Sequence, residues 1–100
     1  MNNKINSLKE ERVIHIPENF AVEEAANFRN SMNKHIDFGE CIFLLDFSRC
    51  KFIDSTGLGV LVGVYKKCVE MGGSVKLKTL NENVMKVFKL TRLDKVFEIL

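Results

Sequence analysis

The chain has 100 residues, of which 46% are hydrophobic and 28% are charged, and its formal net charge is +2. These values are typical of one globular domain, so we expect residues 1–100 to form a single domain with residues 1–10 as a flexible N-terminal segment. The apolar runs are far shorter than the ~20 residues of a membrane span and the N-terminus lacks a signal-peptide core, which favours a cytoplasmic address and no membrane partner.

The first predicted elements are a strand and a helix. The short β-rich segment Arg12–Ile16 is predicted to be a strand that ends at Pro17. A helix is then predicted to begin at an Asn19 N-cap and to end before Gly39, because apolar side chains recur there on one helical face. Those side chains are Val22, Ala25, Phe28 and Met32.

The middle of the chain is predicted to contain a buried strand and a second helix. Cys41–Phe47 is an almost continuous apolar run, which is typical of an interior strand covered on both faces or nearly so. From Ser55 to Met71 the apolar residues recur with a helical period, and Gly72 and Gly73 are predicted to end that helix.

The last predicted elements are a strand, a helix and a strand. Ser74–Leu80 alternates between apolar and polar residues, as a half-exposed strand does. Thr79 and Glu82 have the spacing of a capping box, which predicts a helix behind them. The apolar face of that helix holds Val84, Val87, Phe88 and Thr91. Val96–Leu100 is predicted to be the final strand.

The alternation of strands and helices predicts the fold class. Strand, helix, strand, helix, strand, helix, strand is an α/β pattern, and right-handed crossovers build a mostly parallel sheet from it. We expect a mixed sheet of four to five strands with helices packed against it. The short first strand is expected to pair antiparallel at one edge.

The segment Phe52–Tyr65, FIDSTGLGVLVGVY, combines an acid, two hydroxyls and three glycines at the predicted start of the second helix. A phosphate-binding P-loop needs a lysine after its glycines, and none lies between Lys51 and Lys66. The glycine spacing also differs from the dinucleotide fingerprint, which leaves nucleotide binding as a weaker alternative. Neither a nucleophile elbow nor an aspartic-protease loop fits the order of residues, so no catalytic residue is predicted.

The plainest structural interpretation of this segment is a helix N-cap. Ser55 or Thr56 would accept hydrogen bonds from backbone N–H groups, while the Asp54 carboxylate would favour the positive helix end. Gly57 and Gly59 would permit close packing.

The second helix has two apolar stripes. The stripe expected to face the core holds Leu58, Leu61, Val62, Tyr65, Cys68 and Val69. Val60, Val64 and Met71 gather with Lys67 on roughly the opposite side. A helix that lies on a sheet buries only one stripe, so we interpret the second stripe as a partner's docking strip. A phosphoryl group on the nearby Ser55 would add about −1.5 to −2 charges and oppose an apolar or acidic partner.

The cysteines and histidines predict no disulfide, metal or redox site. Cys41, Cys50 and Cys68 are odd in number and match no disulfide framework or C-x-x-C motif, so we expect free and mostly buried thiols. His15 and His35 are isolated, so no metal ligand set is expected.

Basic residues are concentrated after Tyr65. Residues 66–100 carry eight Lys or Arg against four Asp or Glu, whereas residues 1–65 carry seven against nine. These cations are spread singly or in pairs, without the aromatic residues or the dense stripe of a nucleic-acid binder. A solvated basic face is expected, with no direct nucleic-acid partner and a charge compatible with a moderately acidic protein.

The segments Leu44–Leu77 and Val84–Ile99 together resemble the STAS-domain anti-sigma factor antagonists. They are similar to that family's D-x-S-x-x-x-F-I-D-S-[ST]-G-L-G core, its glycine-pair turn and its L-T-x-L-x-x-V-F close. The chain departs from the family pattern at Pro17–Phe20, near the switch surface, and at Arg92, where L-T-G-L would place glycine. The resemblance implies a single STAS-like domain.

The same resemblance implies a regulator without enzymatic activity or cofactor. The unphosphorylated protein would bind an anti-sigma factor serine kinase and free a sigma factor, while phosphorylation by the kinase switches binding off and a serine phosphatase reverses it. By position the phosphoacceptor is Ser55. The switch motif around it comprises Asp54, Thr56, Gly57, Leu58 and Gly59. A monomer or weak dimer is expected.

An alternative from another class keeps the same fold. The chain would then be a STAS ligand-binding or scaffold module of a transporter, lipid-handling or signalling assembly, and Ser55 would be only a helix cap.

Overall fold

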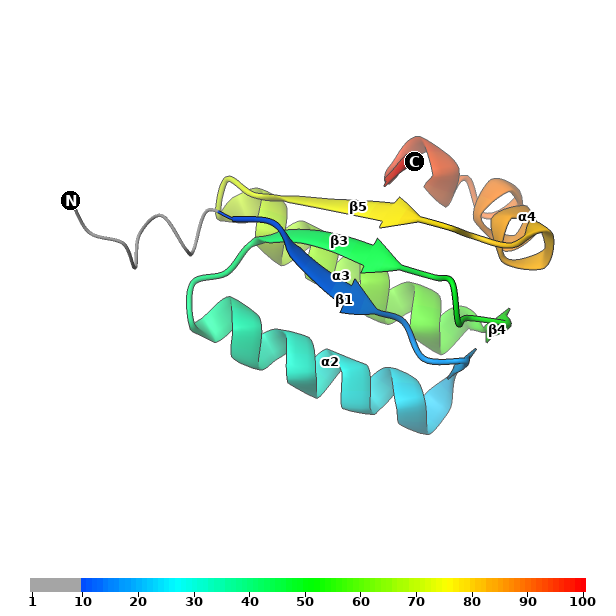
Figure 1. The fold of residues 1–100 in the computed structure, drawn as a ribbon, viewed down its shortest axis with the longest axis horizontal. Coiled ribbons are helices and arrows are strands. Elements are labelled where there is room, and N and C mark those ends of the chain that lie inside the picture. The colour runs from blue at the N-terminus through cyan, green and yellow to red at the C-terminus, as the bar shows by residue number, and fades with distance from the viewer. Residues whose placement is uncertain (1–9) are drawn as a thin grey trace.

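The computed structural model describes residues 10–100, so the predicted flexible segment, residues 1–10, lies outside the described residues except for Glu10. The strands are β1 (Arg12–His15), β2 (Asn19–Phe20), β3 (Ile42–Asp46), β4 (Phe52–Ile53), β5 (Ser74–Lys78) and β6 (Glu98–Ile99). The helices are α2 (Val22–Asp37), α3 (Ser55–Glu70) and α4 (Glu82–Leu90), and a 3-10 turn, η1 (Leu93–Lys95), follows them. Figure 1 shows their arrangement.

A four-stranded sheet with the order β1-β3-β5-β6 forms the centre of the fold, and all of its pairs are parallel. The predicted α/β class and mostly parallel sheet are confirmed. The predicted antiparallel pairing of the first strand is wrong, because β1 pairs parallel with β3 and Arg12 lies opposite Phe43. Helix α2 returns the chain to the end of the sheet at which β1 began, so the next strand runs in the same direction. The predicted edge position of β1 is confirmed.

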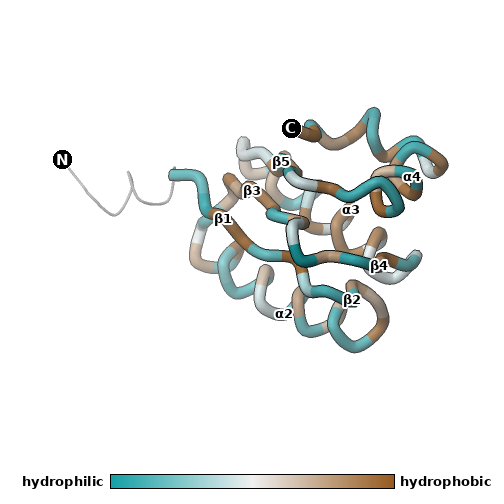
Figure 2. The backbone as a smooth tube through the Cα atoms, turned by 45° about the vertical axis from the view of Figure 1, so that its right-hand side comes forward, coloured by the Kyte–Doolittle hydropathy of each residue, from teal (hydrophilic) through white to brown (hydrophobic). Residues whose placement is uncertain are grey.

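The two long helices lie side by side and pack against the same sheet (Figure 1). The side chains of Phe43 and Leu45 in β3 are fully buried. Ile42 and Leu44 alternate with them and are half-buried, so this strand is covered fully on one face and partly on the other. Figure 2 shows hydrophobic residues running through β1 and β3 and mixed with hydrophilic ones along α2. One face of the sheet therefore carries the core.

Two predicted helix caps are wrong. Asn19 belongs to β2 and its side chain donates to Glu24, while α2 begins after Ala21 without a side-chain cap. Thr79 is also not a cap, because α4 is capped by Asn81, whose side chain accepts from the backbone N–H of Val84 at 2.8 Å. In both regions the N-cap position, Ala21 for α2 and Asn81 for α4, lies two residues after the predicted one.

Asp46 ends β3 with a buried carboxylate that is held by its neighbours. The carboxylate accepts a hydrogen bond of 2.8 Å from the backbone N–H of Ser48, and it lies 3.4 Å from the Nδ1 atom of His15. The Ser48 hydrogen bond is the main cause of a lowered pKa for Asp46, and the charges of Lys78 and His15 add to it. The ionised form is therefore favoured in the folded protein.

This environment predicts a pH-dependent contribution to stability. A carboxyl whose pKa is lower in the folded state stabilises the fold above its unfolded pKa of about 3.8, and that stabilisation is lost as the pH falls through the folded value. Wild type should therefore be more stable than Asp46→Asn at pH 7, and the gap should narrow below pH ~3.8. Urea unfolding of both proteins at several pH values measures the gap, and a gap of constant size would contradict the prediction.

Candidate functional site

A small two-stranded sheet, separate from the main sheet, brings the beginnings of α2 and α3 together. In it β2 pairs parallel with β4, and Phe20 lies opposite Ile53. The carbonyl of Glu18 accepts hydrogen bonds from the backbone N–H groups of Lys51 and Phe52 at 2.8 and 3.2 Å. Because α2 follows β2 and α3 follows β4, this pairing fixes where the predicted switch motif lies relative to α2.

The cap of α3 is Asp54, not a hydroxyl residue. Its side chain accepts a hydrogen bond of 2.9 Å from the backbone N–H of Gly57. Ser55 and Thr56 are the first two residues of the helix and both are exposed. The interpretation of Ser55 or Thr56 as the cap is therefore wrong, and the Ser55 hydroxyl has no hydrogen-bond partner among residues 10–100.

The glycines after the hydroxyls have different roles. A Cβ atom added at Gly57 would collide with the backbone carbonyl oxygen of Phe20, so the predicted close packing is confirmed there. A Cβ atom at Gly59 would meet nothing within 4 Å, so the predicted close packing is wrong for Gly59. Gly63, one turn further along α3, is equally open. Gly57 is therefore required for the packing of α3 against β2. Gly59 and Gly63 are not, and they leave the helix backbone uncovered by any side chain.

The second apolar stripe of α3 is mostly covered. Val60 and Val64 are only 7% and 3% exposed, so the interpretation of these two valines as a free docking strip is wrong in its premise. Helix α2 packs along this side of α3, while the sheet covers the other. Lys67 remains exposed and Met71 is 44% exposed, so only the end of the predicted strip is open.

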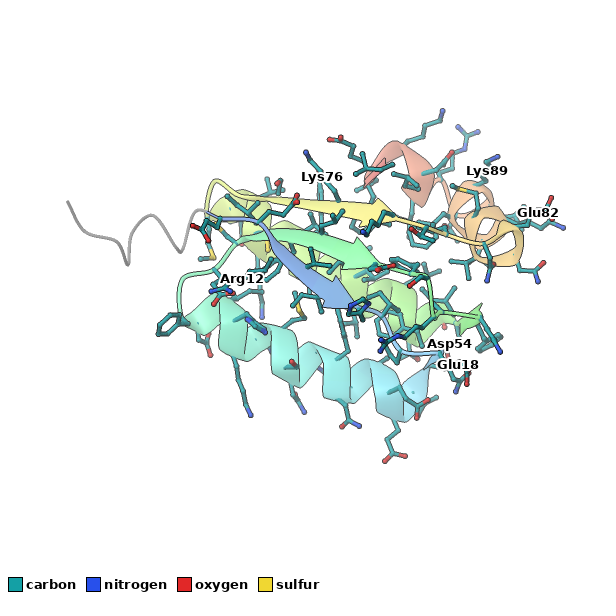
Figure 3. The ribbon with its side chains drawn as sticks, viewed as in Figure 1. Arg12, Glu18, Asp54, Lys76, Glu82 and Lys89 are labelled. Atoms are coloured by element: carbon teal, nitrogen blue, oxygen red, sulfur yellow. The ribbon has the colours of Figure 1, made fainter. Side chains whose placement is uncertain are left out.

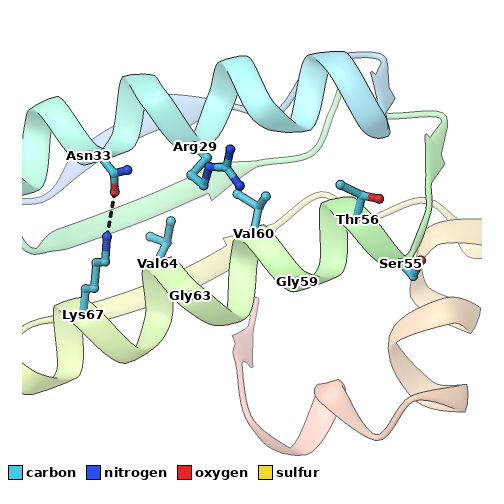
Figure 4. A pocket seen from close by; sticks show the side chains of 9 residues that line it. All are labelled: Arg29, Asn33, Ser55, Thr56, Gly59, Val60, Gly63, Val64 and Lys67. Atoms are coloured by element: carbon cyan, nitrogen blue, oxygen red, sulfur yellow. Dashed lines mark hydrogen bonds between the residues drawn. The ribbon is translucent and has the colours of Figure 1, made fainter.

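A groove runs between α2 and α3 from the Ser55 end toward Lys67 (Figure 4). Its volume is about 290 Å³. The lining residues of α3 are Ser55, Thr56, Gly59, Val60, Gly63, Val64 and Lys67, and those of α2 are Arg29 and Asn33. No sequence motif pointed to Arg29 and Asn33, although their spacing of four residues beside the buried stripe of α2 places them on one helical face.

The end of the molecule that carries Ser55 presents both acidic and apolar groups. Figure 3 shows Glu18 and Asp54 at this end. Phe52 in β4 and Val22 at the start of α2 are 54% and 69% exposed. Val22 has a φ of 34°, a conformation that a β-branched residue rarely adopts. Acidic and exposed apolar side chains therefore share this end of the molecule with the exposed hydroxyl.

The cysteines are free, as predicted, with Cys50 and Cys68 buried and Cys41 half-buried. Burial raises the pKa of the Cys68 thiol to about 11, which keeps it protonated and unreactive. Within residues 10–100 no three His, Cys, Asp or Glu side chains gather as a metal ion would require. No helix of that same range is both long enough and apolar enough to cross a membrane.

Comparison with known proteins gives a family match over nearly the whole chain. The family model of the STAS domain matches residues 4–100. The anti-sigma-B factor antagonist of Bacillus subtilis (strain 168) is 44% identical over 48 residues, which are 48% of this chain and 44% of that protein. The alignments with the curated relatives thus span about half of the relatives' length.

Solved structures share the fold. A candidate anti-sigma factor antagonist from Thermotoga maritima is 31% identical with a TM-score of 0.81, and the match covers 87% of this chain and 77% of that one. The unphosphorylated form of the anti-sigma factor antagonist SpoIIAA is 22% identical with a TM-score of 0.80, over 92% of this chain and 81% of that one. The phosphorylated form of SpoIIAA, from Bacillus, has a TM-score of 0.73 at the same identity and covers 92% of this chain and 84% of that one.

Proposed function

Because the chain belongs to the STAS domain family, we propose that it acts as an anti-sigma factor antagonist. In this proposal the unphosphorylated chain binds an anti-sigma factor that is also a serine kinase, and this binding frees a sigma factor. Phosphorylation of Ser55 by that kinase ends the binding, and a serine phosphatase restores it. The chain is a binding regulator, and its relatives are named as antagonists and not as enzymes.

The observation that carries this proposal is the state of the Ser55 hydroxyl. It is exposed at the first position of α3 and makes no hydrogen bond within residues 10–100, while Asp54 forms the cap beside it. A kinase can therefore reach this hydroxyl without breaking any contact of the fold. The alternative of a ligand-binding or scaffold module gave Ser55 only the role of a helix cap, and Asp54 fills that role, so this alternative is the weaker one.

The surroundings of Ser55 favour a switch that acts on binding and not on folding. A phosphate dianion at the first turn of α3 lies at the positive end of the helix dipole, which stabilises it. For a docked partner the same dianion adds about −1.5 to −2 charges next to the carboxylate of Asp54, the preceding residue. Repulsion and desolvation then weaken the complex.

Incubation with the anti-sigma-B factor of Bacillus subtilis and ATP should add one phosphate to the chain. That protein is chosen because the 44% identical relative is named as its antagonist. Intact-mass measurement should detect one added phosphoryl group in wild type and none in Ser55→Ala. Thr56→Ala is the matched control and should still take up phosphate. Uptake that persists in Ser55→Ala would show that the acceptor is another residue.

A further inference from the structure

Two open glycines in the middle of α3 have no explanation within the fold. Glycine in a helix interior destabilises the helix relative to alanine. At Gly59 and Gly63 a Cβ atom would meet nothing within 4 Å, so no packing within residues 10–100 requires glycine at either position. Gly59 and Gly63 are exposed, so this bare stretch of backbone allows another segment of chain to approach more closely than any side chain would permit.

The rim of the same groove is cationic. Arg29 stands on the α2 side, and its guanidinium has no hydrogen-bond or ion-pair partner within residues 10–100. Lys67 stands on the α3 side, and its Nζ atom donates to the Oδ1 atom of Asn33 at 2.9 Å. None of the residues that line the groove is acidic. The groove therefore favours an occupant that carries negative charge.

The α3 segment that lines the groove is long enough to pack against a short helix. The distance along α3 from Ser55 to Lys67 is about 18 Å at 1.5 Å per residue, which is roughly three helical turns. Val60 and Val64 form the floor of the groove between the cationic rim and the glycines (Figure 4), and they are 7% and 3% exposed. A helix with small or apolar residues facing the glycines and an acidic side chain at its edge would complement this lining.

We propose that the groove between α2 and α3 receives a helix of the anti-sigma factor, with small or apolar residues against Gly59 and Gly63 and acidic side chains paired with Arg29 and Lys67. This assignment rests on the proposed function and names the surface through which that function operates. It also connects the surface to the switch. Ser55 lines the end of the same groove, so a phosphate there repels the acidic helix that the rim attracts.

Calorimetric titration with the purified anti-sigma-B factor of Bacillus subtilis tests the groove. Gly63→Ala should bind at least tenfold more weakly, although its Tm should be unchanged or raised by a few degrees because alanine favours the helix. Gly63→Gln, which fills more of the groove, should bind more weakly still. A loss of binding in a variant that is at least as stable as wild type separates a docking role from a structural one.

Charge variants test the rim with a matched control. Arg29→Glu and Lys67→Glu should each weaken binding at least tenfold. Lys66→Glu makes the same charge change at the next residue of α3, which does not line the groove, and should bind within about twofold of wild type. Equal losses for the Lys66 and Lys67 variants would indicate general charge attraction and would overturn the groove assignment.

The failure of this assignment differs from the failure of the proposed function. If the Gly63 and Arg29 variants bind as wild type does while Ser55→Glu binds weakly, the partner docks elsewhere and the regulator proposal stands. If wild type neither binds the anti-sigma factor nor takes phosphate from it, the proposed function is overturned, and the groove assignment falls with it.

Discussion

A chain phosphorylated on Ser55 should bind the anti-sigma factor about 100-fold more weakly than the unmodified chain, while remaining folded. A hundredfold change is about 2.7 kcal/mol, which is within the several kcal/mol that like charges cost when they face each other in an interface. Folding should be preserved because the Ser55 hydroxyl makes no hydrogen bond within residues 10–100 that the phosphate would replace. The helix dipole of α3 also favours the added charge.

Calorimetry on the phosphorylated chain, with the modification verified by intact mass, measures this effect, and a thermal melt followed by circular dichroism measures stability. Ser55→Glu carries one negative charge and should give a smaller loss in the same direction. Ser31→Glu is the matched control, because Ser31 is an exposed serine of α2 that does not line the groove. Tight binding by the phosphorylated chain would exclude an electrostatic switch at this position.

Periodicity predicted the elements of this fold well because each long element buries one continuous stripe. The helix predicted from Ser55 to Met71 is α3, which spans Ser55–Glu70. The half-exposed strand that was predicted to follow it in the chain is β5, Ser74–Lys78. The two-residue strands β2 and β4 were missed as a pair, because a pattern of alternation needs more residues than they contain. Their pairing is a tertiary contact between segments more than 30 residues apart in the chain.

The role of Ser55 as phosphoacceptor remains a prediction, whereas the predicted exposure of the neighbouring valines is wrong. Ser55 was identified through the motif, and its exposure at the start of α3 agrees with the role of an acceptor. Val60 and Val64 are buried because they face α2, and a helical wheel of α3 alone does not include that neighbour. Arg29 was missed for the same reason, since it reaches the site only through the packing of the two helices.

Gly57→Ala should destabilise the fold by about 2–3 kcal/mol and also weaken binding of the anti-sigma factor. The added methyl group would collide with the carbonyl oxygen of Phe20, which is backbone and cannot rotate away. It would also lie 3.0 Å from side-chain atoms of Phe20 and Ile53. Relief requires β2 to move away from α3, and β2 leads directly into α2.

Gly59→Ala makes the same chemical change two residues later in the helix, where a Cβ atom has open space around it. It should therefore leave stability unchanged or raise it by up to ~1 kcal/mol. Urea unfolding of the two variants measures this difference directly. Equal effects would mean that helix propensity alone governs both positions and that the contact between Gly57 and Phe20 does not constrain the fold. The expected opposite signs would instead show that the close approach of Gly57 to Phe20 ties the start of α3, and with it Ser55, to β2.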